Sequence, residues 1–375
     1  PYPLREPPPL RPAMITLESY LCGRWQAGRP PFVTLVDPTH ERPVAQASSA
    51  GLDLAAAVEF ARQRGGPALR ALSFAQRAEL LKGLSAALHE RREELIEISI
   101  QNGGSTRGDA KFDLDGATGT LAAYAALGKK LGEQRHLPDG EGLQLGRTPR
   151  FWGQHVWVTR PGVAVHINAF NFPAWGQGEK MACALLAGVP VIEKVAEQTA
   201  WIAAEVAKVI VGSGLLPEGA YQFIAGGTGD LLEHLGPADH VAFTGSAHTG
   251  RLVRSHPRLI ERGVRVSVEA DSLNAHVLAP DVASDSGAYD LLLQNLVTDM
   301  TQKAGQKCTA ARRVLVPAER VEAFVADLAA QLGRQKLGDP ADGETRIGAL
   351  TDMRQLERAQ AGIRQLAEKG RILLG

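Results

Sequence analysis

Residues 163–192 have the sequence VAVHINAFNFPAWGQGEKMACALLAGVPVI, and this stretch decides the fold class. It begins with the apolar run VAVHI, which is typical of a buried strand. Pro173 then opens a predicted helix that extends to Leu186, because proline is favoured in the first helical turn and Gly188 can end the helix. A second apolar run, Val189–Ile192, predicts the next strand. The stretch is therefore a strand–helix–strand unit.

The same alternation of short strands and helices extends outward from this unit, between Phe151 and Glu269, and returns after Gln294. Short links between the elements are typical of a parallel sheet that helices cover on both faces. We therefore predict a two-lobed α/β protein whose ligands bind at the carboxyl ends of the strands. The further predicted elements are strands at Tyr221–Ala225, His240–Thr244, Arg265–Glu269 and Val314–Val316, and helices at Ala200–Ile210 and Val321–Leu332.

Two segments depart from this pattern. Residues 1–13 are dense in proline and lack apolar periodicity, which predicts a flexible arm or the remnant of an expression sequence. Phe151–Arg160 alternates polar and apolar residues, which is typical of an extended strand that leaves the main body. This strand is either an edge strand of the first lobe or a contact between subunits, and its pattern favours neither.

The composition excludes several classes of protein. The chain has 375 residues, and its 41 Lys and Arg balance 41 Asp and Glu, so it lacks the excess positive charge that nucleic acids and membrane surfaces attract. Hydrophobic residues make up 44% and charged residues 22%, as in globular proteins. Cys22, Cys183 and Cys308 are widely spaced, which excludes a disulfide framework, argues against a metal site and favours a cytoplasmic location. The longest apolar stretch, Ala182–Ile192, is too short to cross a membrane.

Cys308 is the candidate nucleophile. A thiolate attacks electrophilic carbon readily, and a nearby cation or backbone N–H groups lower the pKa of the thiol. Lys307 precedes Cys308, and Gly305 allows close approach of the backbone. The alternative is a small buried packing residue, which is the role that we expect for Cys22 and Cys183.

Glu269 and Asn171 are the other candidates for catalysis. Glu269 ends an otherwise apolar strand, where partial burial would raise the pKa of its carboxyl toward that of a general base. The alternative is an exposed charge at a strand end. Asn171 lies between a buried strand and a helix, where its side-chain amide can donate to a developing oxyanion. The alternative is a turn asparagine, which is the role that we expect for Asn168.

A second group of residues is suited to a nucleotide. The segment Phe243–Gly250 crosses from a strand to a helix, with Gly245 and Ser246 at the turn. Backbone N–H groups at such a turn favour a pyrophosphate, although ordinary helix caps have the same pattern. Lys194 and Glu197 follow a strand and either bind ribose hydroxyls or form a solvated charge cluster.

Taken together and in this order, these segments resemble the NAD(P)-dependent aldehyde dehydrogenase superfamily, from about Tyr20 to the end of the chain. The motifs that carry the resemblance are NFP at 171–173, KVAEQT at 194–199, FTGS at 243–246 followed by Gly250, Glu269, and GQKC at 305–308. The resemblance implies an aldehyde dehydrogenase-like α/β fold with a Rossmann-type cofactor lobe at 14–148 and 161–270. It also implies an oligomerisation strand at 149–160 and a catalytic lobe at 271–375.

The resemblance also implies a mechanism. Cys308 attacks the aldehyde to form a thiohemiacetal, and the Asn171 amide and the Cys308 backbone N–H form the oxyanion hole. Hydride transfer to the cofactor then leaves a thioester, which Glu269 hydrolyses by activating water. Glu179 lies eight residues after Asn171, about two helical turns, and either relays protons with Glu269 or pairs with a basic neighbour.

For the cofactor, the resemblance implies NAD or NADP without a metal ion. Glu197 favours NAD, because its negative charge repels the 2′-phosphate of NADP. The residues implied to contact the cofactor are Lys194, Glu197, Gly226, Gly245, Ser246 and Gly250.

Two departures from the family pattern point to one branch. The glycines that usually follow the general base are replaced by ADSLN at 270–274, and the stretch between Glu269 and Cys308 is long. These features, with HINAFNFP at 166–173 and AGQKCTA at 304–310, are similar to the CoA-linked semialdehyde dehydrogenases of bacterial aromatic catabolism. That branch includes the benzoyl-CoA-pathway dehydrogenase for 3,4-dehydroadipyl-CoA semialdehyde and the dehydrogenase half of the bifunctional phenylacetate ring-opening enzyme. Family members continue for about another hundred residues, so we expect the C-terminal part of the fold to be missing.

The predicted function is the NAD(P)-dependent oxidation of an aldehyde, a CoA-linked semialdehyde, to the carboxylic acid by a cytoplasmic homodimer that binds neither nucleic acid nor membrane. One alternative is a CoA-acylating aldehyde dehydrogenase. Family members of that kind generally lack the glutamate, so Glu269 favours hydrolysis. The other alternative is an inactive cofactor-binding protein with a structural or regulatory role.

Overall fold

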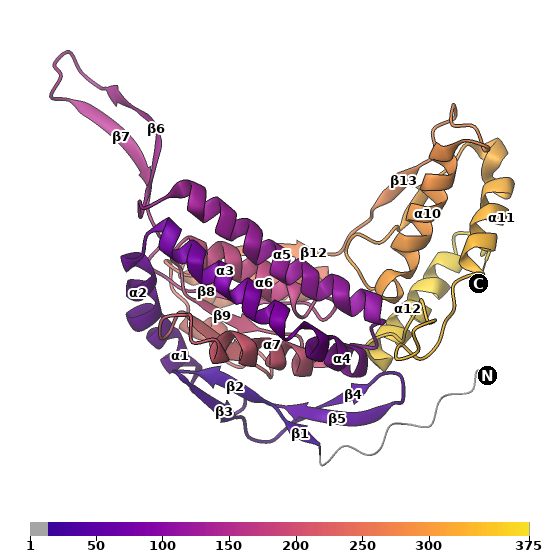
Figure 1. Ribbon diagram of the computed structural model, residues 1–375, viewed down its shortest axis with the longest axis horizontal. Helices are drawn as coiled ribbons and strands as arrows, with labels where there is room; N and C mark the ends of the chain where they lie inside the picture. Colours follow the sequence, from indigo (N-terminus) through magenta and orange to yellow (C-terminus); the bar gives the residue numbers. More distant parts are fainter. Residues whose placement is uncertain (1–13, 375) are drawn as a thin grey trace.

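The centre of the molecule is a seven-stranded sheet with the strand order β12–β11–β8–β9–β10–β2–β3 (Figure 1). It is seen in a computed structural model that describes residues 14–374. Strands β8 to β12 run parallel, whereas β2 pairs antiparallel with both β10 and β3. The strand bounds are β2 (Glu18–Leu21), β3 (Arg24–Ala27), β8 (Ala164–Ile167), β9 (Val191–Lys194), β10 (Tyr221–Ile224), β11 (His240–Gly245) and β12 (Arg265–Ala270).

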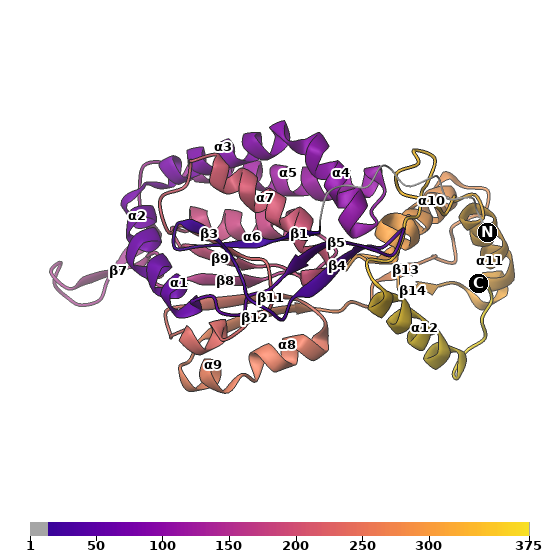
Figure 2. The ribbon, with the colours of Figure 1, turned by 90° about the horizontal axis from the view of Figure 1, so that it is seen from below.

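Helices cover both faces of this sheet, which confirms the predicted α/β class (Figure 2). Helices α3, α5, α6 and α7 share one core with side chains of β9 and β10. Helices α1, α8 and α9 share a second core with side chains of β8 and β11. The helix bounds are α1 (Leu54–Phe60), α2 (Gly66–Ala71), α3 (Phe74–Glu90), α4 (Arg92–Gly103), α5 (Arg107–Leu131), α6 (Trp175–Leu186), α7 (Ala200–Gly212), α8 (Ala247–Arg254) and α9 (Pro257–Glu261).

Local sequence signals set the start of the long helix α5. The preceding helix α4 ends at Gly104, whose left-handed φ of 64° costs glycine little. Thr106 then caps α5: its hydroxyl accepts from the backbone N–H of Asp109 at 3.2 Å and donates to the Asp109 carboxylate at 2.8 Å. The tight link between Gly104 and Thr106 therefore fixes where the first turn of α5 lies.

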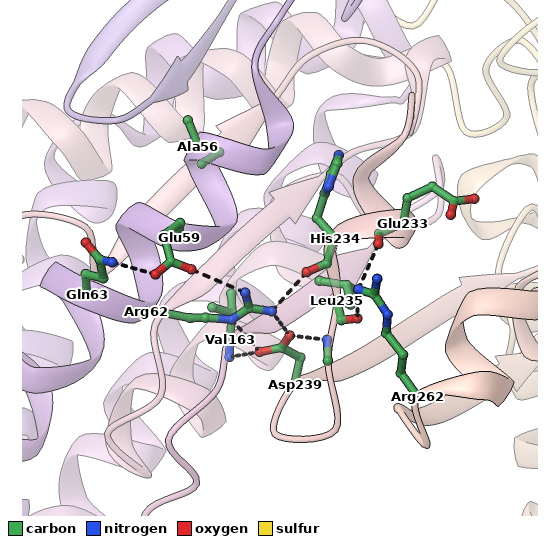
Figure 3. A network of polar contacts seen from close by, with 12 residues as sticks. Ala56, Glu59, Arg62, Gln63, Val163, Glu233, His234, Leu235, Asp239 and Arg262 are labelled. Carbon is green, nitrogen blue, oxygen red and sulfur yellow. Dashed lines mark hydrogen bonds and ion pairs between the residues drawn. The ribbon is translucent and has the colours of Figure 1, made fainter.

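A partly buried ion pair joins the N-terminal helices to the sheet (Figure 3). Arg62, in the π-helical turn after α1, donates to both carboxylate oxygens of Asp239. The Asp239 side chain is fully buried and also accepts from the N–H groups of Val163 at 2.8 Å and Gly236 at 2.7 Å. Burial acts to lower the pKa of Arg62, but the hydrogen bond and charge of Asp239 outweigh it and raise that pKa. One carboxylate thus holds together the turn after α1 and the starts of β8 and β11.

Three small sheets lie outside the central sheet among the described residues, two of them before residue 158. The three-stranded sheet has the order β1–β5–β4, and the other is an antiparallel hairpin of β6 and β7. Their strands are β1 (Ile15–Thr16), β4 (Val33–Asp37), β5 (Arg42–Ala47), β6 (Leu137–Gln144) and β7 (Trp152–Trp157).

The hairpin extends away from the body of the molecule (Figure 1). Its strand β7 corresponds to the extended strand predicted near 151–160, but it pairs with β6 and not with the central sheet. The interpretation as an edge strand of the first lobe is therefore wrong. Large apolar side chains are exposed along the hairpin and just after it, including Leu143, Trp152, Trp157 and Val158.

The last part of the chain has a small core of its own. Strands β13 and β14 pair in parallel, and α10 and α11 pack around Leu278, Leu296 and Phe324. The bounds are β13 (Ala275–Val277), α10 (Gly287–Thr301), β14 (Arg313–Leu315), α11 (Val321–Leu332) and α12 (Met353–Ala367). Across residues 14–374, no helix combines the length and the apolar character that crossing a lipid bilayer requires.

Candidate active site

Asn171 lies in the loop between β8 and α6, and a buried network beneath this loop fixes its path. Asn168 donates from Nδ2 to Glu193 Oε2 at 2.7 Å, and its backbone N–H donates to the carbonyl of Lys194 at 2.9 Å. The other oxygen of the buried Glu193 lies 2.6 Å from His166 Nδ1. The expectation that Asn168 is a simple turn residue is therefore wrong, because it anchors the loop to β9.

The start of α6 fixes the other end of this loop. Asp113 of α5 accepts from the backbone N–H groups of Ala174 at 3.1 Å and Trp175 at 2.8 Å. Burial raises the pKa of Asp113, although the nearby Lys303 ammonium opposes that rise. The Asn171 side chain is half-buried and forms no hydrogen bond with any residue in 14–374, so its amide is available to a ligand.

The backbone before Cys308 follows an uncommon course. Lys303, Ala304 and Gly305 have consecutive left-handed φ angles of 54°, 53° and 72°. Residues other than glycine rarely occupy this region, at a cost of about 1–3 kcal/mol each, and such strain is concentrated at functional sites. This turn leads from the end of α10 to Cys308, which is exposed. The alternative of a buried packing cysteine is therefore wrong for Cys308.

The charge of Lys307 is directed to α10. Its Nζ donates to Asp299 Oδ1 at 2.7 Å and to Gln302 Oε1 at 2.8 Å, and the side chain is buried. We expected the Lys307 ammonium to act on the thiol of Cys308, but the contacts of Lys307 do not support this expectation. Arg312 donates to the Lys307 carbonyl at 3.3 Å and so supports the same loop from the other side.

The segment that follows Glu269 holds the Cys308 loop. The carbonyl of Cys308 accepts from Ser272 Oγ and, at 2.6 Å, from Asn274 Nδ2. Asn274 also donates to the carbonyl of Ala310 at 3.1 Å. The backbone N–H of Cys308 forms no hydrogen bond within residues 14–374. The end of β12 and the candidate nucleophile are thus tied together within a few residues.

Glu269 itself is exposed at the end of β12, so the expected partial burial is not observed. Its partner in the register with β11 is Thr244, whose hydroxyl donates to Glu269 Oε2 at 3.3 Å. This contact orients the carboxylate while leaving it accessible to water.

Asn171 and the Cys308 loop meet at a small cavity. Its walls include Asn171, Lys303, Gln306 and Thr351. Lys303 is buried, and its Nζ lies 4.8 Å from the centre of the Phe172 ring. Burial lowers the pKa of Lys303, while two aspartates of α5 oppose this effect. The oxyanion candidate and the loop of the nucleophile therefore face one space.

Glu197 lines a cavity of about 480 Å³ beside the end of β9, together with Gly227 and Gly229. A Cβ atom on Gly227 would come within 3.4 Å of Glu197 Oε1, so glycine keeps this side of the carboxylate open. Lys194, at the end of β9, is half-buried; burial lowers its pKa, and the charge of Glu197 opposes this effect. This geometry suits a sugar whose hydroxyls need a carboxylate acceptor.

Three glycines that we expected at the cofactor have clear packing reasons. A Cβ on Gly226 would come 2.3 Å from the backbone nitrogen of Ser49. One on Gly250 would come 2.6 Å from Val268 Cγ1, so this glycine lets α8 approach β12 closely. A Cβ on Gly245 would come 2.7 Å from the ring of Phe243.

The first turn of α8 has two side-chain caps. Ser246 Oγ accepts from the backbone N–H of Thr249 at 3.2 Å, and the Asp271 carboxylate accepts from that of Ala247, also at 3.2 Å. Asp271 replaces a glycine of the family pattern and has a left-handed φ of 52°, a region that aspartate tolerates better than most residues. A carboxylate thus lies at the helix end where the sequence predicted a pyrophosphate.

The remaining candidates are not brought into this site by any contact. Glu179 Oε1 lies 3.1 Å from Lys180 Nζ, in agreement with the alternative of a basic neighbour. Cys183 is exposed, so its expected packing role is wrong, while Cys22 is half-buried. Within residues 14–374, no three His, Cys, Asp or Glu side chains are grouped in a way that could hold a metal ion.

These observations define an α/β protein in which the loop of the candidate nucleophile Cys308 is tied to the segment after Glu269. The model of the Aldehyde dehydrogenase family matches residues 25–375. The chain therefore belongs to the aldehyde dehydrogenase family, whose members are NAD(P)-dependent oxidoreductases, and the resemblance found in the sequence is confirmed.

The relatives include a CoA-linked semialdehyde dehydrogenase. Over 359 aligned residues the chain is 43% identical to the 3,4-dehydroadipyl-CoA semialdehyde dehydrogenase of Aromatoleum evansii. The alignment covers 96% of the chain and 70% of that protein. It is 28% identical over 309 residues to 4-trimethylaminobutyraldehyde dehydrogenase B of Danio rerio, and spans 56% of its length.

Solved structures show the same fold. An apo betaine aldehyde dehydrogenase mutant from Staphylococcus aureus gives a TM-score of 0.84 at 20% identity, over 96% of this chain and 70% of that one. An NADP-dependent enzyme of E. coli gives 0.83 at 23% identity, over 96% of this chain and 73% of that one. These likenesses support the fold.

Proposed function

We propose that this protein oxidises a CoA-linked semialdehyde to the carboxylic acid with NAD(P), in the cytoplasm. One observation carries the proposal: the loop of Cys308 is held by the segment after Glu269 and shares a cavity with Asn171. These contacts support a shared site for Cys308, Glu269 and Asn171. The 43% identity to a dehydrogenase named for a CoA semialdehyde supports the substrate class.

In the first step, the Cys308 thiolate adds to the aldehyde carbon, and the carbonyl oxygen becomes an oxyanion. The Asn171 amide and the Cys308 N–H stabilise that charge, since neither donor is engaged elsewhere within residues 14–374. A bound nicotinamide would supply the acceptor for the hydride of the substrate carbon. The acyl group then remains on Cys308 as a thioester.

In the second step, Glu269 removes a proton from a water molecule that attacks the thioester carbon. The C–S bond breaks, the carboxylic acid leaves, and Cys308 returns to the thiolate. Its exposed position and the contact with Thr244 suit Glu269 for this role, because the carboxylate is oriented and reaches solvent water.

The residues present fit the adenosine part of a dinucleotide. Glu197 faces the open space that Gly227 leaves and would accept from ribose hydroxyls, and Lys194 lies at the end of the adjoining strand. The negative charge of Glu197 favours NAD over NADP. Gly245, Ser246 and Gly250 shape the turn into α8, and a pyrophosphate there would have to displace the Asp271 carboxylate from the N–H of Ala247.

We also propose that the β6–β7 hairpin is a subunit contact of a homodimer. It lies outside the central sheet and exposes Trp152 and Trp157, the latter to 66%. The proposed division of the chain follows: a cofactor-binding domain at 14–136 and 161–270, and a catalytic domain from 271 onward. The oligomerisation element, predicted at 149–160, begins earlier, with β6 at Leu137. Replacing Trp157 by Glu should lower the molar mass measured by light scattering to that of a monomer.

The test of the catalytic proposal is the rate of reduced cofactor formation with a CoA-linked semialdehyde. Cys308→Ala should abolish it, whereas Cys183→Ala, at another exposed cysteine, should leave it unchanged. Unchanged activity of Cys308→Ala would remove this residue from the chemistry. The reaction is also run with and without free CoA, and a strict requirement for free CoA would reject hydrolysis by Glu269 in favour of acyl transfer.

A further inference from the structure

A large polar cavity lies next to the active site, between the start of α5 and the helices α10 and α11. Its volume is about 830 Å³, within the range of about 300–1,000 Å³ typical of small-molecule sites. The start of α5 and the end of α10 lie side by side at one end of the central sheet (Figures 1 and 2). A loop at 342–346 closes the third side.

Three cationic side chains from two segments line this cavity, namely Arg107, Lys111 and Arg346. Neither Lys111 nor Arg346 forms an ion pair with any residue in 14–374, whereas Arg107 pairs with Glu93 and Glu97. The charge of Lys111 also helps to lower the pKa of Glu93, so Lys111 has an acidic neighbour, whereas Arg346 forms no ion pair within the described residues. A cation of the latter kind in a concave site is suited to an anionic ligand.

The acidic side chains in the same cavity are engaged. Asp109 accepts from the Thr106 hydroxyl at 2.8 Å, and Asp342 lies 2.9 Å from Lys336 Nζ. Their carboxylates thus have contacts of their own in the wall of the cavity.

A buried hydroxyl in the wall also lacks a partner. Thr345 is only 4% exposed, and its Oγ1 forms no hydrogen bond within residues 14–374. This oxygen has almost no accessible surface, so a ligand in the cavity would be held by the side chains around it and not by this hydroxyl. The glutamine side chains of Gln294 and Gln331 line the same space and supply amide donors and acceptors.

The cavity shares its inner wall with the active site. Gln302 lines it, and Gln302 Oε1 accepts from Lys307 Nζ at 2.8 Å, one residue before Cys308. The next residue after Gln302, Lys303, lines the cavity that holds Asn171. The two spaces are therefore separated by the short stretch of chain at residues 302–303.

We propose that this cavity binds the phosphate-bearing end of a CoA thioester, with Lys111 and Arg346 at its phosphates. The inference rests on the proposed function and deepens it. CoA carries a diphosphate and a 3′-phosphate at one end and an amide-containing pantetheine arm at the other. This arm separates the phosphates from the aldehyde, so cations remote from Cys308 suit a CoA-linked substrate and have no role with a short free aldehyde.

The test is a calorimetric titration of the full chain with CoA itself, which requires no catalysis. Lys111→Gln and Arg346→Gln should each weaken CoA binding about tenfold, as expected for a lost charged hydrogen bond. The double variant should weaken it about a hundredfold. Lys129→Gln, a matched change at the opposite, exposed end of α5, should leave the dissociation constant unchanged.

Two further arms identify the ligand. CoA without its 3′-phosphate should bind more weakly than CoA, and NADP should not displace CoA. The charge-conserving changes Lys111→Arg and Arg346→Lys should retain binding, which separates loss of charge from misfolding. With active protein, the ratio of kcat/KM for a CoA-linked semialdehyde to that for the free semialdehyde should fall in the two Gln variants.

Failure to bind CoA, equal affinity in the double variant, or displacement of CoA by NADP would each overturn the proposal. Failure of the catalytic proposal has a different signature. Cys308→Ala would then retain oxidation, while the CoA titration and its dependence on Lys111 and Arg346 would stand.

Discussion

The hydroxyl of Thr244 donates to Glu269 Oε2 at 3.3 Å, across two neighbouring parallel strands. The two residues face each other in the register of β11 and β12, at the carboxyl ends where α/β sheets present their ligands. The orientation of the proposed base is therefore set by the sheet itself.

Changing Glu269 to Gln should separate the two halves of the reaction. The amide keeps the shape but cannot take a proton from water, so steady-state turnover should fall about 100- to 10,000-fold. A rapid burst of reduced cofactor, one equivalent per active site, should remain in stopped-flow absorbance. Glu179→Gln serves as the control. Loss of the burst together with turnover would show that Glu269 acts before thioester formation.

The two asparagines of the β8–α6 loop should respond in opposite ways. Asn171→Ala should lower kcat about 100- to 1,000-fold with an unchanged unfolding midpoint, because it removes one oxyanion donor. Asn168→Ala should instead lower the free energy of unfolding by about 1–3 kcal/mol, because it leaves a buried oxygen of Glu193 unpaired. Urea unfolding and steady-state kinetics on both variants check this prediction. If Asn168→Ala lowered kcat and Asn171→Ala lowered the free energy of unfolding, the roles assigned to the two residues would be exchanged.

Replacing Glu197 by Ser should shift the cofactor preference toward NADP. A carboxylate near the ribose repels a 2′-phosphate, and losing that repulsion should raise the ratio of kcat/KM for NADP over NAD at least about tenfold. Glu205→Ser, on the neighbouring helix α7, is the matched control. An unaltered ratio in the Glu197 variant would remove this residue from the ribose site.

Removing the carboxylate of Asp239 should destabilise the whole fold. Asp239→Ala leaves Arg62 and two backbone N–H groups without their acceptor. Because Arg62 is 28% exposed, we expect a loss of about 2–3 kcal/mol, below the range for fully buried pairs. Glu261→Ala, which breaks the surface pair with Arg258, should leave the urea midpoint unchanged. If the two variants lost the same free energy of unfolding, the Asp239 network would contribute no more to stability than a surface ion pair.

Lys303 should make stability depend on alkaline pH. Burial lowers its pKa below the 10.5 of an unfolded lysine. Between these two values the unfolded chain binds more protons, so the free energy of unfolding gains a contribution that rises with pH and levels off above 10.5. Lys303→Met should abolish this rise in urea midpoints measured from pH 8 to 11, relative to Lys129→Met. A parallel pH profile in wild type and variant would contradict the burial effect.

The elements of the central sheet are largely predictable from the sequence. Apolar runs and proline or glycine stops place β8, α6, β10 and β12 within a few residues, and Val321–Leu332 matches α11 at both ends. Strand β6 was missed because its sequence, LPDGEGLQ, contains proline and glycines typical of a turn and lacks apolar alternation. Hairpin pairing with β7, and not local propensity, makes it a strand.

The details of the site depend on contacts between distant residues, which local patterns do not contain. The ion pair of Lys307 with Asp299 and the exposure of Glu269 are of this kind. One signal was available: Glu193 is a carboxylate that directly follows the apolar residues Val191 and Ile192 in β9, and a buried charge requires a partner. In the sheet its partner in the register is His166 of β8.

The position of β2 beside β10 has a consequence for how the protein is made. Tyr20 pairs with Phe223, so the ribosome must synthesise about two hundred residues before this contact can form. Until then the first strands have no place in the sheet, and a chain without them would present β10 as a bare edge with unpaired backbone groups, open to association with other chains. The N-terminal hairpin of β2 and β3 thus covers the edge of the sheet that β10 would otherwise expose.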